Sequence, residues 1–296
     1  MKKVIYFILT LMFLLPVSSM GQQKGTSKDG LISWSLSDDG TLTITGQGEL
    51  SCNKLATSNS SYREFMSSVN CIIISPGITE VSWLNGAGTK VTSISLPNTL
   101  KKIGPHAFDG YKFLHSMTIP ASVTEIAQSA FETDECNGSE LEELIVDSRN
   151  TKYKSINGIL YDYDVKTLIC CPSGYKSEAN IPNTVETIGE GAFFLCHKLT
   201  SIKFPDNLKT IKTHAFACCY KLTDVKLPDN LETIEERAFW CCSELMSITI
   251  PNSVTKFDTS AFSGCKKIAK AYVPKDWAIA EDDPIFPKNC TIIHHK

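Results

Sequence analysis

A repeat with a period of 23 runs through most of this 296-residue chain and constrains its fold more than any other feature. Each copy follows the pattern PxxLxxIxxxAFxxCxxLxxIxL. The copies are marked by Pro97, Pro120, Pro182, Pro205, Pro228, Pro251 and Pro274. The numbers of successive prolines differ by 23, except between Pro120 and Pro182. A fixed period of about 20 to 29 residues with Leu, Ile and Val in this register is typical of a solenoid of stacked coils.

Equivalent apolar residues should form ladders, because a single coil cannot bury its apolar face and needs a neighbour stacked about 4.8 Å away. One inward column comprises Leu100, Val123, Val185, Leu208, Leu231 and Val254. A second comprises Ile103, Ile126, Ile188, Ile211, Ile234 and Phe257. A third comprises Phe108, Phe131, Phe193, Phe216, Phe239 and Phe262, each preceded by Ala. We therefore predict an α/β leucine-rich-repeat solenoid, with a parallel sheet on one face and short helical or 3₁₀ turns on the other.

Three regions are expected in addition to the regular coils. Residues 22–68 should form an N-terminal β cap, since two alternating segments flank a Ser-Asp-Asp-Gly turn at 37–40. The solenoid should span residues 69–275, followed by a C-terminal cap at 276–296. The interval from Pro120 to Pro182 is not a multiple of the repeat period. We therefore expect an inserted β-hairpin at about 148–180, with strands at 159–161 and 167–170, and a coil that bulges outward.

The N-terminus has the pattern of an export signal. Lys2 and Lys3 precede an uncharged stretch from Val4 to Val17, with small residues shortly after it, so residues 1–21 should be a signal peptide. No later segment has the length and apolarity of a transmembrane helix. The formal net charge of −3 gives no indication of nucleic-acid binding. We expect an exported protein that is secreted or at the cell surface, with the periplasm as a further compartment.

The repeat frame with AFxxCxxL and a closing Ile/Leu-Pro resembles the BspA-like leucine-rich repeats of bacterial exported and surface proteins. Two other segments are similar to modules found with such repeats, WSLSDDGTLTITGQGEL near the N-terminus and NGILYDYDVKTLICCP in the interruption. The resemblance implies the solenoid fold and export. Some family members are adhesins that bind host matrix proteins or other cells, whereas most have no assigned role.

Six of the 12 cysteines lie in two columns of the repeat, and the CxxC spacing of thiol oxidoreductases and zinc ribbons is absent. Cys196, Cys219, Cys242 and Cys265 fill one column, one per repeat, as small apolar side chains would. A disulfide from Cys196 to Cys219, or from Cys242 to Cys265, is geometrically allowed, but we favour free thiols. We predict no metal and no cofactor, and we expect His294 and His295 to lie in a frayed terminus.

The catalytic motifs GxSxG, HExxH, the P-loop and GxGxxG are absent from the sequence, so we predict that the protein is not an enzyme. A solenoid presents side chains on a rigid lattice, and the solvent side of its parallel sheet is the expected binding surface. The candidate ligand-binding residues on that sheet are Lys203, Lys226, Lys270 and Tyr272, with Tyr161 and Tyr163 on the inserted hairpin as exposed contacts. The expected partner is a host extracellular or bacterial surface protein. The alternative is a glycan-binding accessory role at the bacterial cell surface.

Overall fold

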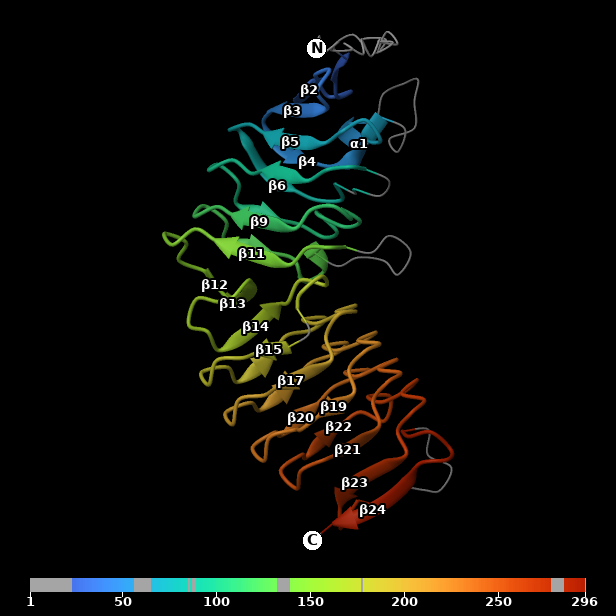
Figure 1. Ribbon diagram of the computed structural model, residues 1–296. Coiled ribbons are helices and arrows are strands. Elements are labelled where there is room, and N and C mark those ends of the chain that lie inside the picture. Colours follow the sequence, from blue (N-terminus) through green and yellow to red (C-terminus); the bar gives the residue numbers. More distant parts are fainter. Residues whose placement is uncertain are drawn as a thin grey trace, which may run out of the picture.

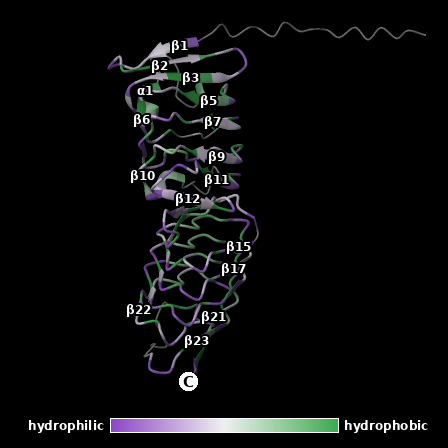
Figure 2. Cartoon of the chain, turned by 90° about the vertical axis from the view of Figure 1, so that its left-hand side faces the viewer, coloured by the Kyte–Doolittle hydropathy of each residue, from purple (hydrophilic) through white to green (hydrophobic). Residues whose placement is uncertain are grey.

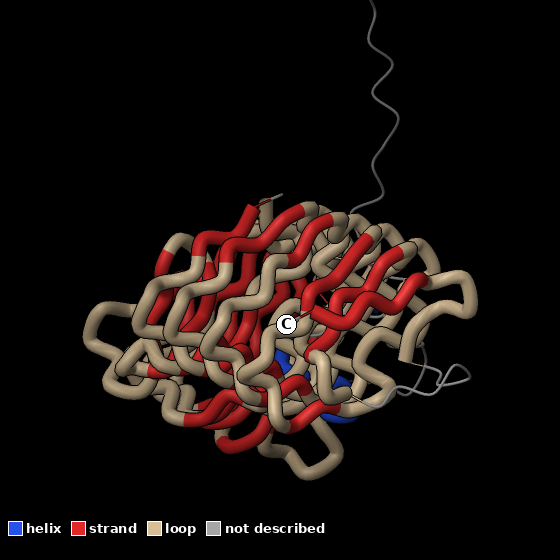
Figure 3. Tube along the Cα trace, turned by 90° about the horizontal axis from the view of Figure 1, so that it is seen from below, coloured by secondary structure: helices blue, strands red, loops and turns tan. Residues whose placement is uncertain are grey.

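The computed structural model describes residues 23–55, 65–84, 86, 89–131, 139–176, 178–277 and 285–295, and these form a β-solenoid (Figure 1). The coils stack along one axis, with the N-terminal strands at one end and the C-terminus at the other (Figure 2). The view along that axis shows successive windings lying one behind another (Figure 3). The predicted solenoid is confirmed. The predicted signal peptide, residues 1–21, lies outside the described residues.

The strands before the repeat prolines form the first wall of the solenoid. After an antiparallel start by β1 (Gln23–Thr26) and β2 (Ile32–Leu36), the wall is parallel. Its strands are β3 (Thr41–Gly46), β5 (Cys71–Ile74), β7 (Ser93–Ser95), β9 (Ser116–Ile119), β11 (Glu143–Val146), β15 (Glu178–Asn180), β17 (Ser201–Lys203), β19 (Asp224–Val225), β21 (Ser247–Thr249), β23 (Lys270–Pro274) and β24 (Thr291–His295). Hydrogen bonding divides them into sheets β1-β2-β3-β5-β7, β9-β11, β15-β17-β19 and β21-β23-β24.

A second parallel wall, which the sequence did not predict, runs along the inward isoleucine column. Its strands are β4 (Gly48–Leu50), β6 (Ile78–Val81), β8 (Lys102–Ile103), β10 (Glu125–Ile126), β14 (Thr167–Cys170), β16 (Thr187–Ile188), β18 (Thr210–Ile211), β20 (Thr233–Ile234) and β22 (Lys256–Phe257). Ile188, Ile211 and Ile234 lie in register across it and are buried. Strands this short cannot show alternation in the sequence, so they become visible only when coils stack.

The third wall contains the Ala-Phe pairs and is built mostly of turns, in place of the predicted helical segments. Among the described residues, the helices are α1 (Cys52–Leu55) and the 3₁₀ helix η1 (Gln128–Phe131). Elsewhere the turns bond to the next coil, as Phe216 N donates to Ala238 O at 2.7 Å. The residue before the Ala-Phe pair is left-handed in several coils, with φ of 55° at His214 and 51° at Arg237. In those coils, this conformation ends helical winding before the Ala-Phe pair.

Phenylalanine rings stack along the inside of the third wall. Phe193, Phe216, Phe239 and Phe262 follow one another with centroid separations of 4.7, 5.0 and 5.2 Å. All four side chains are fully or almost fully buried. The Leu and Val column opposite them is buried as well, so the predicted inward ladders are confirmed.

The insertion lies across the stack and does not bulge outward as expected. Its strands β12 (Tyr153–Ile156) and β13 (Ile159–Asp162) pair antiparallel with each other, and β13 pairs antiparallel with β14. Strand β14 then pairs parallel with β16 and so starts the second wall of the C-terminal half. Leu160 packs into a core formed by the N-terminal coils, whereas Ile159 and Tyr161 pack into the core of the C-terminal coils. The insertion therefore separates two hydrophobic cores.

Candidate functional site

The solvent face of the first wall in the C-terminal half carries two regular rows of side chains. Strand pairing aligns Asn180 with Lys203, Lys226 with Thr249, and Thr249 with Tyr272. A second row, two positions earlier in each strand, comprises Glu178, Ser201, Asp224, Ser247 and Lys270. The buried residues between the rows point into the core, which fixes the orientation of both rows. We call this surface the C-terminal face.

Four of the predicted binding residues lie together on the C-terminal face. Lys203, Lys226 and Lys270 are exposed, and Tyr272 is half-buried. Ile202 pairs with Val225, and Lys203 and Lys226 come directly after these two residues, so the two lysines occupy equivalent positions on adjacent coils. Like charges on neighbouring strands destabilise a sheet unless something compensates them.

Charges on the second wall are paired, in contrast. Glu186 forms ion pairs with Lys166 and Lys209, and the Nζ of each lysine lies 3.2 Å from a carboxylate oxygen of Glu186. These lysines lower the pKa of the Glu186 carboxyl group. Among the ion pairs of the described residues, none involves Lys203, Lys226 or Lys270. The C-terminal face thus retains positive charges that no acidic neighbour among those residues neutralises at contact distance.

The two tyrosines of the insertion are not part of this face. Tyr161 was expected to be exposed, but that prediction is wrong, because its side chain is fully buried in the C-terminal core. Burial raises the pKa of its phenol well above the usual range. Tyr163 is 44% exposed, with the ammonium of Lys154 at 4.0 Å from its ring centroid. It precedes a second-wall strand, so it lies away from the lysine row.

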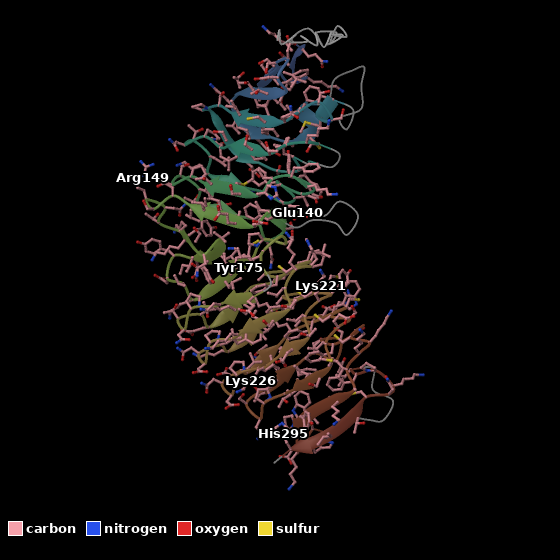
Figure 4. All side chains as sticks on the ribbon, in the orientation of Figure 1. Glu140, Arg149, Tyr175, Lys221, Lys226 and His295 are labelled. Carbon is pink, nitrogen blue, oxygen red and sulfur yellow. The ribbon has the colours of Figure 1, made fainter. Side chains whose placement is uncertain are left out.

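A hollow of about 710 Å³ opens on the C-terminal face between β19 and β21. Pairing between these strands is reduced to the single bridge of Lys226 with Thr249. The polar side chains lining the hollow are Asp224, Lys226, Asp229, Ser247, Thr249, Asn252, Ser253 and His295. Figure 4 shows Lys226 and His295 in the C-terminal half, with Lys221 on the other side of the molecule. We call this cavity the β19–β21 hollow.

The terminal histidines are ordered in β24, which corrects the expectation of a frayed end. His295 Nε2 donates to the carbonyl oxygen of Ile250 at 2.9 Å, and His294 Nδ1 lies 3.2 Å from Pro274 O. The Ile250 carbonyl faces Pro274 in the parallel register, and proline has no N–H to donate. The imidazole of His295 supplies the donor that the ladder lacks, which holds it at the edge of the hollow.

Asp224, Asp229 and His295 line the hollow but were not predicted as site residues from the sequence. No role was predicted for Trp83, which is 53% exposed and packs against His106 with ring centroids 4.5 Å apart and ring planes tilted by 36°. The Pro-Asp-Asn turn that carries Asp229 was visible as a repeat feature, but its position beside a gap in the ladder was not. Only the strand pairing reveals that gap.

The described residues contain no group of three or more His, Cys, Asp or Glu side chains that could hold a metal ion. The Asp-rich turn at 162–164 is accounted for by backbone contacts, since Asp162 Oδ1 accepts from the N–H groups of Lys166 and Thr167. The described cysteines carry free thiols. Within the described part of the chain, no helix is both long enough and apolar enough to cross a bilayer.

Comparison with known proteins agrees with the repeat architecture. The family model described as "BspA type Leucine rich repeat region" matches in six copies over residues 59–157 and 172–292, which is more than half of the chain. The comparison with curated proteins gives no match.

Solved structures share the fold at low sequence identity. A leucine-rich repeat protein from Eubacterium ventriosum is 20% identical, with a TM-score of 0.58, covering 92% of this chain and 85% of its own. The pneumococcal vaccine antigen PcpA is 18% identical, with a TM-score of 0.59, covering 93% and 99%. A leucine-rich cell surface protein from Faecalibacterium prausnitzii is 21% identical, with a TM-score of 0.56, covering 91% and 94%.

Proposed function

The chain belongs to the BspA-type leucine-rich repeat family, and we propose that it is an exported, non-catalytic protein that binds another protein through the C-terminal face of its first wall. The partner is a host extracellular protein or a bacterial surface protein. Secretion or display at the cell surface fits the sequence of residues 1–21, and one structural neighbour is itself described as a cell surface protein.

The unpaired lysines on neighbouring strands are the observation that carries this proposal. Lys203 and Lys226 are exposed on a rigid wall, without an acidic partner in ion-pair contact among the described residues. A partner with acidic side chains would relieve the repulsion between them and gain in association rate through electrostatic steering. The row continues to Tyr272, whose ring adds the amphipathic contact area that is common in protein interfaces.

Capture of partners by the mature chain tests the proposal. Immobilised protein is incubated with host extracellular and bacterial surface extracts, and retained proteins are identified by mass spectrometry. One identified partner should bind the wild type and be lost from Lys203→Glu with Lys226→Glu. The matched control is Lys212→Glu with Lys221→Glu, which makes the same charge change at exposed lysines outside the first wall and should retain the partner. Equal retention by both variants, or no retained partner, contradicts the proposal.

A further inference from the structure

The β19–β21 hollow has the size and rigidity of a small-ligand site. Its volume of about 710 Å³ falls within the range of about 300–1,000 Å³ that is usual for such sites. Its lining comes from β19, β21, the turns that follow them, and the last strand β24. Strand-borne side chains are held more precisely than those on loops, so the site is largely preformed.

The gap that creates the hollow lies where the first wall passes from the sheet β15-β17-β19 to the sheet β21-β23-β24. In the coil before it, β17 and β19 pair at Ser201 with Asp224 and at Ile202 with Val225. In the coil after it, β21 and β23 pair at three positions. Between β19 and β21 one bridge remains, so this stretch of the wall has an opening that its neighbours lack.

The chemistry of the lining excludes several ligand classes. Two carboxylates, Asp224 and Asp229, and one ammonium, Lys226, give a formal charge of −1 with His295 neutral. Inside the hollow, a phosphate or sulfate would meet two carboxylates against the single ammonium of Lys226 and would be repelled, whereas Lys203 lies outside the hollow. A hydrocarbon would remove charged groups from water without replacing their hydrogen bonds. A neutral ligand rich in hydroxyl groups avoids both costs, because each hydroxyl can donate to a carboxylate and accept from the ammonium.

We propose that the β19–β21 hollow is a binding site for a neutral saccharide. Asp224 and Asp229 accept hydrogen bonds from sugar hydroxyls, and Lys226 donates to them. The hydroxyl groups of Ser247 and Thr249 add donors and acceptors along the lining, and Ser253, whose hydroxyl donates to Leu231 O at 2.6 Å, adds an acceptor.

Tyr272 provides an aromatic surface next to the hollow. It pairs with Thr249 across β21 and β23, and Thr249 lines the hollow, so the two side chains share the C-terminal face. The apolar C–H face of a sugar ring packs on such an aromatic ring, while the ring's polar edge remains free for hydrogen bonds. His295 closes the edge of the site, because its bond to Ile250 O fixes the imidazole there.

Ligand-observed NMR and calorimetry with defined probes test the site. The probes are neutral di- to tetrasaccharides built from glucose, mannose, galactose or N-acetylglucosamine, and a sulfated heparin tetrasaccharide as the anionic counter-probe. At least one neutral probe should bind the wild type. Asp224→Asn with Asp229→Asn, and separately Tyr272→Ala, should weaken that binding by about tenfold or more.

Asp206→Asn is the matched control, because Asp206 occupies the position of Asp229 one coil earlier and does not line the hollow. It should bind as the wild type does, and all variants should keep the wild-type thermal unfolding curve. Binding of the sulfated probe alone, unchanged binding by the Asp224 and Asp229 variant, or no binding by any neutral probe would overturn the proposal. Lys203→Glu tests the protein-binding function separately, because Lys203 is outside the hollow.

Discussion

Leu160 and Tyr161 are consecutive residues of β13, yet their side chains are fully buried in two different hydrophobic cores. Strand alternation sends Leu160 toward the N-terminal coils and Tyr161 toward the C-terminal coils. Cys170 and Cys171 repeat the arrangement at the end of β14, because Cys170 packs against the N-terminal core and Cys171 is buried in the C-terminal one. The insertion is thus a partition that closes one core and opens the next.

Replacing a buried side chain of β13 by Ala should reduce hydrogen-exchange protection mainly in the half of the solenoid that this side chain packs against. Leu160→Ala should cost about 2–5 kcal/mol and reduce hydrogen-exchange protection mainly in β8 to β11. Ile159→Ala packs on the other side and should reduce protection mainly in β16 to β20. Hydrogen exchange followed by mass spectrometry distinguishes the two patterns. Equal loss of protection in both halves from both variants would show that the cores are coupled.

Removing the hydroxyl of Tyr161 should not destabilise the protein. Tyr161 Oη is buried and has no hydrogen-bond partner within the described part of the chain. A buried unsatisfied polar group is costly, so Tyr161→Phe should leave stability unchanged or raise it by up to about 1 kcal/mol. Urea unfolding of the two proteins measures the difference. A loss of more than about 1 kcal/mol would indicate a hydrogen bond that this structure does not contain.

Replacing a phenylalanine in the interior of the ring stack should lower the free energy of unfolding strongly. Phe216 lies between Phe193 and Phe239, at centroid distances of 4.7 and 5.0 Å. Phe216→Ala should cost about 3–5 kcal/mol, because it removes contacts on both sides and leaves a cavity. Phe113 is 45% exposed, so the same substitution there should change stability by less than about 0.5 kcal/mol. Similar effects at both positions in denaturant titrations would contradict the stacked arrangement.

The buried thiols should resist alkylation in the native protein. Cys219 Sγ donates to Phe193 O at 3.1 Å and Cys242 Sγ to Phe216 O at 3.2 Å, each reaching the preceding coil. Iodoacetamide should modify the partly exposed Cys52, Cys71 and Cys290 first and leave these two unmodified until unfolding. Peptide mass spectrometry measures the order in which the cysteines are alkylated. Rapid native labelling of Cys219 would place it outside the core.

Stability should also fall at alkaline pH. Burial raises the pKa of the Cys219 and Cys242 thiols well above the usual range. In the unfolded chain the same thiols ionise near pH 8.5, so above that pH the unfolded state releases protons that the folded state retains. The free energy of unfolding should therefore decrease from about pH 8.5 upward. Cys219→Ala with Cys242→Ala should show a shallower decrease in unfolding experiments across this range.

The repeat made much of the fold predictable. The period set the coil length, and the Leu, Ile and Phe columns identified inward residues such as Leu208, Ile211 and Phe216, which are buried. The second wall could not be predicted, because a pair such as Thr210–Ile211 becomes a strand only by pairing with Thr233–Ile234 of the next coil. The left-handed residues before Ala-Phe were also hidden, because the residue type at this position changes from coil to coil and Arg237 is not of a type that is enriched at positive φ.

The candidate site was predictable only in part. The sequence placed Lys203, Lys226, Lys270 and Tyr272 on one face, because successive side chains of a strand point alternately into the core and into solvent. Tyr161 was misplaced because the hairpin was expected to stand outside the stack, where both tyrosines would meet solvent. The β19–β21 hollow depends on the loss of ladder pairing between two coils and on His295 reaching Ile250, which is distant in sequence. Repeat columns do not encode either feature.

Site-specific photo-crosslinking tests whether the C-terminal face binds a protein partner. Benzoyl-phenylalanine is placed at Asn180 or Thr249 on that face, and at Glu232, an exposed position beside the second wall, as the control. After irradiation with extracellular and surface proteins, the account predicts one discrete adduct, identified by mass spectrometry, from Asn180 and Thr249 and none from Glu232. Adducts of equal yield from all three positions, or none from the face, would contradict it.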